Sequence, residues 1–360
     1  MTLFLVVTCC VSGVVADPID IAGNGQPGSK VSPFQLPAVD GLRGGTQPEK
    51  HIVAIGDEPA ATITVVCFLG AECPLARLYG PRLNAMADEF ASRGVRFVGI
   101  NSNRQDSLED VRSYVSDHEI AFPIDKDYQN VVADQFGARR TPEVFVTDAT
   151  LTIRYRGRID DQYEPGLSRT KPSRRELRVA LYELLAGRPV SQPANEPTGC
   201  LIGRVKNVNN QSDITSDVTF AKQVSRVLIK HCVECHRAGE IGPFALTDYD
   251  EVVGWADTML ETIADRRMPP WHASNEHGTF SNARFMPAED KQILREWVAA
   301  GLPLGDPGDL PDLPAAVAGW QFPHEPDLVL NMRPRPFTVP ATGTVDYQYF
   351  VVDPGFKEDK

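Results

Sequence analysis

Residues 61–74 read ATITVVCFLGAECP, and this stretch decides the fold of the first half of the chain. Residues 61–69 are a continuous run of apolar and β-branched side chains, as expected for a strand that is covered on both faces. A short turn follows, and after it comes a segment with apolar residues at Leu75 and Leu83. The pattern therefore predicts a buried strand that leads directly into an amphipathic helix.

The next part of the chain continues to alternate between strand and helix patterns. Residues 95–101 are predicted to form a second buried strand, and Ser107 gives a capping signal for a helix whose apolar stripe includes Val111 and Val115. The remaining predicted elements are a helix over 131–136, strands over 143–147 and 152–158, a helix over 174–186 capped by Gly187, and an initial strand and turn over 33–41. The sequence thus predicts an α/β unit in this half.

This order of elements resembles the redoxin group, which comprises thioredoxins and peroxiredoxins of the alkyl-hydroperoxide-reductase type. Cys73 lies at the strand-to-helix turn where that group keeps its reactive cysteine, and Thr141-Pro142 matches the position of its cis-proline. The resemblance covers about residues 31–187. It implies a thioredoxin-like fold in which Pro142 faces the sulfur of Cys73. A thiol on the first helical turn also feels the positive end of the helix dipole, which favours its thiolate.

The chain departs from the redoxin pattern at two positions. Thioredoxins have a second cysteine where this chain has Ala76, and peroxiredoxins usually have a threonine where it has Gly70. Two interpretations of Cys73 therefore stay open, a redox-active thiol and an inert remnant. Cys200 lies in a segment rich in proline and glycine, and it either resolves an oxidised Cys73 or is a free thiol. The first interpretation is favoured, because a mobile exposed thiol suits that task. Cys67, in the middle of a strand, is predicted to be a packed core residue.

A second motif lies in the other half of the chain, where residues 232–236 read CVECH. C-x-x-C-H is the spacing used to attach a c-type haem. Cys232 and Cys235 would bind the two vinyl groups of the porphyrin, and His236 would be the proximal ligand of the iron. The alternatives are a zinc half-site and a disulfide turn. Zinc usually needs a second Cys/His pair, and none is formed by the nearby candidates Cys200, His231, His272 and His277.

The sixth ligand of such an iron has to come from a residue downstream. Met268 is the main candidate, because residues 268–271 read MPPW and the prolines stiffen the loop that holds its thioether. Methionine opposite histidine gives a six-coordinate electron carrier of relatively high potential. The alternatives are Met286 as the ligand, His272 as a second histidine ligand, and an open site, while Met259 is more readily a core residue of a helix.

Helices predicted at 220–230 and 287–300 flank this motif, as in small cytochromes c. Residues 218–306 resemble the cytochrome c modules that are fused to redoxins in large exported bacterial proteins. After them, strand-like stretches at 327–330, 337–339 and 345–351 resemble the opening of a copper-dependent, ascorbate-type monooxygenase region. None of the copper ligands of that family can be mapped onto this chain.

The termini and the charge complete the predicted organisation. Residues 1–16 have the apolar core and small-residue end of a signal peptide, although no basic residues precede the core. The predicted segments are a signal peptide (1–16), an irregular leader (17–45), a thioredoxin-like redoxin domain (46–187), a linker (188–217), a cytochrome c-like domain (218–306) and a Pro-rich tail with an incomplete β region (307–360). No later stretch is apolar enough for a membrane helix, so an integral membrane protein is not expected.

The net charge of −12 argues against a nucleic-acid partner, and the basic run at 169–175 is expected to be a surface charge run. The sequence predicts an exported, periplasmic or otherwise extracytoplasmic bacterial protein. Its fold would be an α/β thioredoxin-like domain followed by an all-α cytochrome c-like domain and a short β-rich C-terminal tail.

One covalent haem c would carry electrons between small redox proteins or quinol-derived donors and either the Cys73 site or a downstream copper oxidase-like domain. Two other functions stay open. One is a one-cysteine thiol peroxidase that uses Cys73, and the other is a haem-based sensor or binding module.

Overall fold

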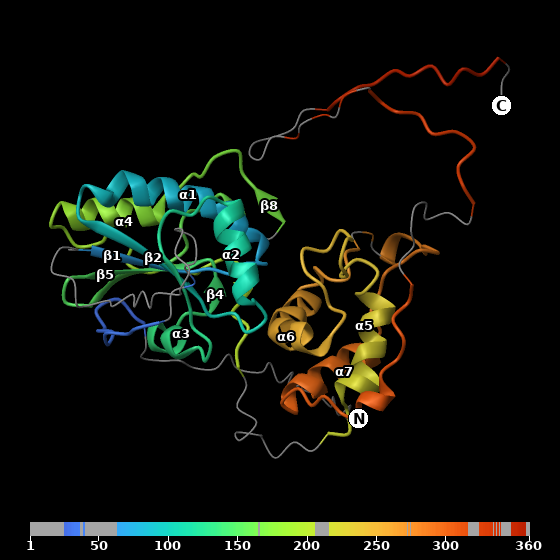
Figure 1. Ribbon diagram of the computed structural model, residues 1–360, viewed down its shortest axis with the longest axis horizontal. Coiled ribbons are helices and arrows are strands. Elements are labelled where there is room, and N and C mark those ends of the chain that lie inside the picture. Colours follow the sequence, from blue (N-terminus) through green and yellow to red (C-terminus); the bar gives the residue numbers. More distant parts are fainter. Residues whose placement is uncertain are drawn as a thin grey trace, which may run out of the picture.

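The computed structural model describes residues 25–36, 39, 63–164, 166–205, 216–271, 273, 275–315, 324–333, 335, 337, 339 and 347–357. The predicted signal peptide, most of the leader and His272 lie outside these residues. Figure 1 shows an α/β domain in the first half of the chain and a separate group of helices in the second half.

A five-stranded mixed sheet forms the centre of the first domain (Figure 1). Its order is β3-β2-β1-β5-β6, with β1–β3 parallel to one another and β5 and β6 antiparallel to their neighbours. The strands are β1 (Ile63–Phe68), β2 (Val95–Asn101), β3 (Ile124–Lys126), β5 (Glu143–Asp148) and β6 (Ile153–Gly157). Successive residues of β1 enter different cores, Val65 on one face and Val66 on the other. This explains why the strand is a continuous apolar run.

Helices cover both faces of this sheet. α1 (Pro74–Ala91), α2 (Leu108–Asp117) and α4 (Glu176–Leu185) pack into the core on one face. α3 (Val131–Phe136) packs on the other face (Figure 1). Ser107 caps α2 through a capping box with Asp110, as predicted. The predicted thioredoxin-like architecture is thus confirmed.

The second domain consists of helices in its described residues. They are η2 (Phe220–Val224, a π-helical turn), α5 (Ser225–His231), α6 (Tyr249–Ala264), η3 (Asn275–His277, a 3₁₀ turn) and α7 (Ala288–Ala299), followed by the 3₁₀ turn η4 (Pro307–Asp309). The fully buried Trp255 and Trp297 lie in their common core. The helices predicted at both ends of this domain are therefore present, although the first one begins as a π-helical turn.

Short strands complete the first domain, and one of them comes from the predicted linker. β4 (Arg140–Thr141) pairs with β9 (Cys200–Leu201), and β7 (Tyr163–Glu164) pairs with β8 (Leu167–Ser168). An isolated bridge also joins Arg156 and Ala194. The first part of the predicted linker (188–217) therefore packs on the redoxin domain.

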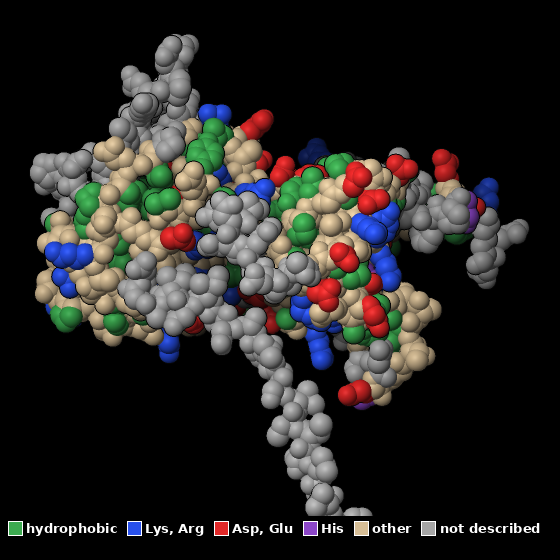
Figure 2. All heavy atoms as spheres, turned by 90° about the horizontal axis from the view of Figure 1, so that it is seen from below, with side chains coloured by type: hydrophobic (Ala, Val, Ile, Leu, Met, Phe, Trp, Pro, Cys, Tyr) green, Lys and Arg blue, Asp and Glu red, His purple; other side chains and the backbone are tan. Residues whose placement is uncertain are grey.

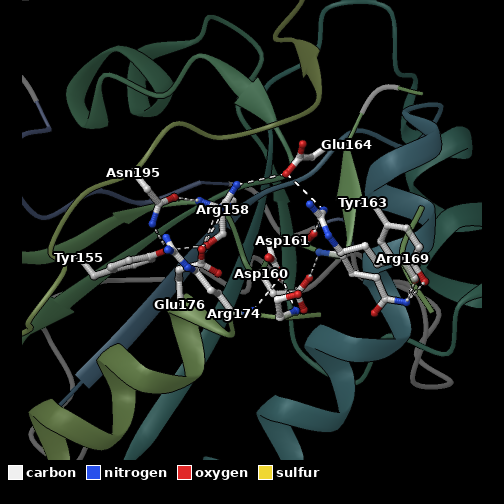
Figure 3. Close-up of polar contacts among 12 residues, drawn as sticks. Tyr155, Arg158, Asp160, Asp161, Tyr163, Glu164, Arg169, Arg174, Glu176 and Asn195 are labelled. Atoms are coloured by element: carbon white, nitrogen blue, oxygen red, sulfur yellow. Dashed lines mark hydrogen bonds and ion pairs between the residues drawn. The ribbon is translucent and has the colours of Figure 1, made fainter. Parts of the chain in front are cut away.

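The basic run at 169–175 is tied to acidic groups of its own domain (Figure 3). Arg169 donates a hydrogen bond to the carbonyl oxygen of Asp161 at 2.7 Å, and the carboxylate of Asp161 accepts one from the backbone of Arg174 at 2.8 Å. On the face drawn in Figure 2, basic and acidic side chains are interspersed. Both observations agree with the expectation of a surface charge run.

Two strand predictions were wrong. The segment expected to form an initial strand over 33–37 has no strand in its described residues, and only Lys30 makes an isolated bridge, to Thr152. The described residues after 309 also contain no strand, so the predicted β-rich tail is not formed there. A strand needs a neighbour to satisfy its backbone hydrogen bonds, and the described residues of the tail pair with no strand.

None of the described helices combines the length and the apolar character that crossing a bilayer requires.

Candidate functional site

Cys73 lies where β1 passes into α1. It is the N-cap residue of α1, with Pro74 in the first helical turn, and its side chain is 0% exposed. Its thiol donates a hydrogen bond to the backbone carbonyl of Thr141 at 2.9 Å. The Thr141–Pro142 peptide bond is cis. The structure therefore brings together Cys73 and the Thr141-Pro142 pair that the sequence singled out.

Cys200 joins this site through backbone pairing. In the β4–β9 pair, Cys200 lies opposite Thr141, whose backbone carbonyl is the one that Cys73 contacts, and the Cys73 and Cys200 thiols are close enough to shift each other's pKa. Cys200 was expected to be mobile and exposed, which is wrong, because it is partly buried and fixed in a strand. The structure nevertheless places it beside the sulfur that it was predicted to resolve.

The pKa values of the two neighbouring thiols are shifted in opposite directions. Burial alone would raise the pKa of Cys73, but hydrogen bonds from Cys200, the backbone of Ala76 and Thr141 outweigh it and lower the pKa to about 6. The pKa of Cys200 is raised well above its ordinary value by the hydrogen bond to Cys73 and by burial. The directions of these two pKa shifts mark Cys73 as the thiol that ionises first and Cys200 as the one that keeps its proton.

Cys67 differs from these two cysteines. It is 0% exposed on β1, and burial raises its pKa further. A buried thiol that stays protonated is unreactive. The prediction of a packed core residue is confirmed.

Gly70 explains one departure from the redoxin pattern. A Cβ atom at this position would lie 2.5 Å from Nδ2 of Asn103, 2.8 Å from Oγ1 of Thr141 and 3.0 Å from Cβ of Cys73. The space that a threonine side chain would need is therefore taken by Asn103 and Thr141. The Thr141 hydroxyl is buried, and among the described residues the Cys73 sulfur is the one group that it can serve as a donor. It remains able to donate to an atom bound at the sulfur.

A buried polar cluster supports the turn that carries Cys73, and the sequence analysis missed it. Asp106 accepts hydrogen bonds from the backbone of Ala71 at 2.7 Å and from the side chain of Asn101 at 2.6 Å. Lys126 donates to Oδ1 of Asn101 at 2.6 Å and to the carbonyl of Asp106 at 2.6 Å. The signal was the run of polar residues directly after the buried strand over 95–101, at the sheet edge where Cys73 also lies.

The CVECH motif directly follows α5, and its histidine has a defined orientation. His236 is buried, and its Nδ1 lies 3.1 Å from the carbonyl oxygen of Phe244. A carbonyl can only accept, so Nδ1 carries the proton and Nε2 keeps its lone pair. This is the arrangement that orients a metal-binding imidazole. Cys232 and Cys235 are partly buried and are not joined in a disulfide.

A cavity of about 550 Å³ lies near this motif and is lined by both candidate methionines, Met268 and Met286. It does not include the motif residues themselves in its wall, but Arg284 in the wall forms an ion pair with Glu234 of the motif at 2.8 Å. Met259 is a buried core residue of α6. The four predicted haem-binding side chains have the right chemistry, but the cavity wall contains Met268 without Cys232, Cys235 or His236, so haem binding stays a prediction.

The described residues give no support to a zinc site, because among them no group of three or more His, Cys, Asp and Glu side chains could hold a metal ion. His231, the histidine before the motif, lies 2.7 Å from the carboxylate of Asp290 on α7. The predicted alternative of a zinc half-site is therefore weakened.

The fold and the cysteine site define the first domain as a thioredoxin-like redoxin domain. Residues 27–160 match the model of the AhpC/TSA family, which supports a redoxin domain in this part of the chain. The match ends before the helical domain, whose cytochrome c-like character stays a prediction. The chain has no match among curated proteins.

Several solved structures are similar to the first half of the chain. A hypothetical protein from Sinorhizobium meliloti is 26% identical over 51% of this chain and 96% of its own, with a TM-score of 0.45. An uncharacterized conserved protein from Geobacillus kaustophilus is 30% identical over 51% of this chain and 94% of its own, with a TM-score of 0.44. The peroxidoxin BcpB from Mycobacterium tuberculosis is 19% identical over 45% and 94%, with a TM-score of 0.32.

Proposed function

We propose that the redoxin domain is a two-cysteine thiol peroxidase, in which Cys73 attacks a hydroperoxide and Cys200 resolves the product as a disulfide. The observation that carries this proposal is the β4–β9 register, which places Cys200 opposite Thr141, the residue whose backbone carbonyl lies 2.9 Å from the sulfur of Cys73. The lowered pKa of Cys73 and the raised pKa of Cys200 agree with these roles. This develops the thiol peroxidase alternative of the sequence, in which Cys73 is the attacking thiol and Cys200 was one candidate for re-reducing it. The complete burial of Cys73 favours a small oxidant over a bulky disulfide substrate.

The reaction consumes one peroxide and oxidises two thiols. The thiolate of Cys73 attacks one peroxide oxygen, the O–O bond breaks, and the other oxygen leaves as an alcohol or water after it takes up a proton. Cys73 is then a sulfenic acid. Cys200 loses its proton and attacks the sulfur of Cys73, the S–O bond breaks, and water leaves. An external dithiol or small redox protein then reduces the disulfide.

A single-turnover experiment tests the proposal. The reduced protein is mixed with one equivalent of hydrogen peroxide, quenched and analysed by mass spectrometry. Wild type should form a Cys73–Cys200 disulfide, Cys200→Ser should accumulate a sulfenic acid on Cys73 that dimedone traps, and Cys73→Ser should not react. Cys67→Ala is the matched control and should behave as wild type.

Two results would count against the peroxidase. If peroxide leaves the thiols reduced but a small aromatic disulfide oxidises the pair, the domain is a thiol–disulfide oxidoreductase instead. If neither reagent joins Cys73 to Cys200, the two-cysteine proposal is wrong.

We propose as a second function that the helical domain carries one covalent haem c. Cys232 and Cys235 would bind it through thioethers, and His236 and Met268 would be the iron ligands. The orientation of His236 by the Phe244 carbonyl supports this proposal. When bound, the haem supplies single-electron transfer. The protein would then be an extracytoplasmic electron carrier that exchanges electrons with small redox proteins or quinol-derived donors.

The haem proposal is tested by expressing the full chain with a c-type maturation system. The mass should increase by one haem, and the reduced pyridine spectrum should show saturated vinyl groups. The variant with both Cys232→Ala and Cys235→Ala is the control and should contain no covalent haem. A colourless wild-type protein of unmodified mass from a competent host would exclude this function.

A further inference from the structure

The two domains meet at the cysteine pair. Cys200 packs against the core of the redoxin domain and against the core of the helical domain. The next residue, Leu201, donates its backbone hydrogen to the hydroxyl of Thr258 on α6 at 3.1 Å. The strand that carries Cys200 is therefore held between β4 on one side and α6 on the other.

An ion-pair cluster from both domains lies over this strand. Arg140 of β4 donates to the carbonyl of Gly199 at 2.8 Å and forms an ion pair with Glu261 of α6 at 3.0 Å. The same carboxylate binds Arg267 at 3.0 Å. All three side chains are about one quarter to one third exposed, so their charges are only partly screened. Arg140 thus connects Glu261 of the helical domain to Gly199, the residue directly before Cys200.

The backbone after α6 directs neighbouring side chains to different sites. Arg266 has a left-handed conformation with φ of 60°, and the backbone N–H groups of Arg267 and Met268 both donate to the carbonyl of Thr262, at 2.9 and 3.1 Å. Arg266 and Met268 line the cavity of the helical domain, whereas the charge of Arg267 acts on Cys200.

Close packing fixes α6 against the redoxin domain. A Cβ atom at Gly254 of α6 would collide with the side chain of Gln105, and a Cβ atom at Gly203 would collide with the same side chain. An ion pair between Arg104 and Asp250 at 3.2 Å lies beside this contact. Because α6 is packed this tightly at Gly254, the position of Glu261 on the same helix is fixed relative to Arg140.

We infer that the helical domain completes the thiol site, with Glu261 and Arg267 as positioning residues that hold Arg140 and the Cys200 strand for disulfide formation. This inference rests on the proposed two-cysteine reaction. It assigns the two residues to the second step, because they act through Arg140 on Gly199, the residue before Cys200, and contact no atom of Cys73. The first step needs only the Cys73 thiolate, which neither Glu261 nor Arg267 touches.

The chemistry of the second step explains why this support is needed. Cys200 has to give up its proton and reach the sulfur of Cys73, and the guanidinium groups of Arg140 and Arg267 both favour its thiolate. The charged and titratable groups that face Cys200 are Cys73, Arg140 and Arg267, with Glu261 between the two arginines. Without Glu261 both guanidinium charges remain, but Arg140 loses the partner that fixes it on the Gly199 carbonyl, so the Cys200 thiol is no longer held in line with Cys73 and the step slows.

The test separates the two steps in the full chain. Reduced protein is mixed with one equivalent of hydrogen peroxide, and sulfenic acid on Cys73 and the Cys73–Cys200 disulfide are measured over time by mass spectrometry. Glu261→Gln and Arg267→Ala should form sulfenic acid at the wild-type rate but the disulfide roughly fivefold more slowly, as expected from the loss of a half-buried charge pair. Arg267→Lys, which keeps the charge, should recover part of the rate.

Asp250→Asn is the matched control, because it removes a different ion pair between the same domains. Its disulfide should form at the wild-type rate. If Glu261→Gln and Arg267→Ala form the disulfide as fast as wild type, or if both steps slow equally, the inference is wrong. If wild type itself forms no disulfide, the proposed function has failed instead.

Discussion

Cys200 and Thr141 lie opposite each other in the β4–β9 pair, and this register places the Cys200 thiol against Cys73. In a Cys-x-x-Cys motif, one helical turn holds both sulfurs. Here a segment from beyond α4 supplies the second sulfur by adding a short strand to the redoxin domain. The reactive pair is therefore assembled only when that segment and α6 are in place.

The acidity of Cys73 gives the first prediction. Thiolate absorbance near 240 nm should titrate with a midpoint at about pH 6 for Cys73 in wild type. Cys200→Ala should move the midpoint towards 9, because Cys200 gives the first of the hydrogen bonds that lower this pKa. Cys67→Ala should leave it unchanged. A wild-type midpoint near 9 would contradict the proposed hydrogen bonding.

The second prediction concerns the ion pair that supports the loop before Thr141. Glu143 is fully buried, binds Arg156 at 2.9 Å and accepts a hydrogen bond from the backbone of Arg139 at 2.7 Å. Glu143→Gln leaves a buried guanidinium without its counter-charge, so we expect it to lower the free energy of unfolding by about 3 kcal/mol. Urea unfolding measures this change.

The control for this prediction is Glu196→Gln. Glu196 pairs with Arg139 at 2.8 Å, but its side chain is 83% exposed. Its loss should cost less than about 1 kcal/mol. If the two substitutions lower the free energy of unfolding equally, the buried Glu143–Arg156 pair contributes no more to stability than a surface pair.

The sequence predicted the central elements well because their periodicity reflects burial. The bounds expected for β2 and α3 agree with the structure, since a strand covered on both faces and a short helix between turn signals leave clear patterns. The environment of Cys200 could not be predicted, because it depends on where a Pro-rich segment runs. The prediction of strands in the tail was wrong for its described residues, because β-branched residues favour a strand only where a partner strand is available.

The haem motif shows that a sequence pattern identifies residues but not the contacts that orient them. The spacing of CVECH identified the residues, but the hydrogen bond from His236 to Phe244 requires the chain to turn back after the motif. Nothing in the sequence connected Glu261 or Arg267 with the cysteine pair. Their role there depends on how the two domains meet.

The third prediction concerns Glu72, which precedes Cys73. Burial, followed by the charges of Asp106, Asp110 and Glu251, raises its pKa to about 7. The unfolded chain ionises Glu72 at about 4.5, so the folded state binds more protons between these values. The stability that Glu72 contributes is then lost as the pH rises from about 4.5 to about 7.

The substitution Glu72→Gln should remove this pH dependence. At pH 8 the variant should be more stable than wild type, by less than about 1 kcal/mol because the group is partly exposed and screened. Thermal unfolding at pH 5 and pH 8 measures the difference. If wild type and variant have parallel profiles, the carboxyl of Glu72 does not titrate in this range.

The last prediction distinguishes the two methionines of the cavity. Met268 is 40% exposed, whereas Met286 is 6% exposed and belongs to the core of the helical domain. In protein loaded with haem, Met268→Ala should abolish the weak red-end absorption band that methionine ligation gives, and Met286→Ala should keep it. Met286→Ala should instead lower the free energy of unfolding by about 2–3 kcal/mol, the cost of a cavity in a core.

These results are expected because the thioether of Met268 is not committed to the core and its backbone is fixed by the hydrogen bond to Thr262. A ligand needs both a free side chain and an anchored backbone. If the band survives in Met268→Ala and disappears in Met286→Ala, Met286 is the ligand and leaves the core when the haem binds. If both variants keep the band, the sixth ligand is neither methionine of this cavity.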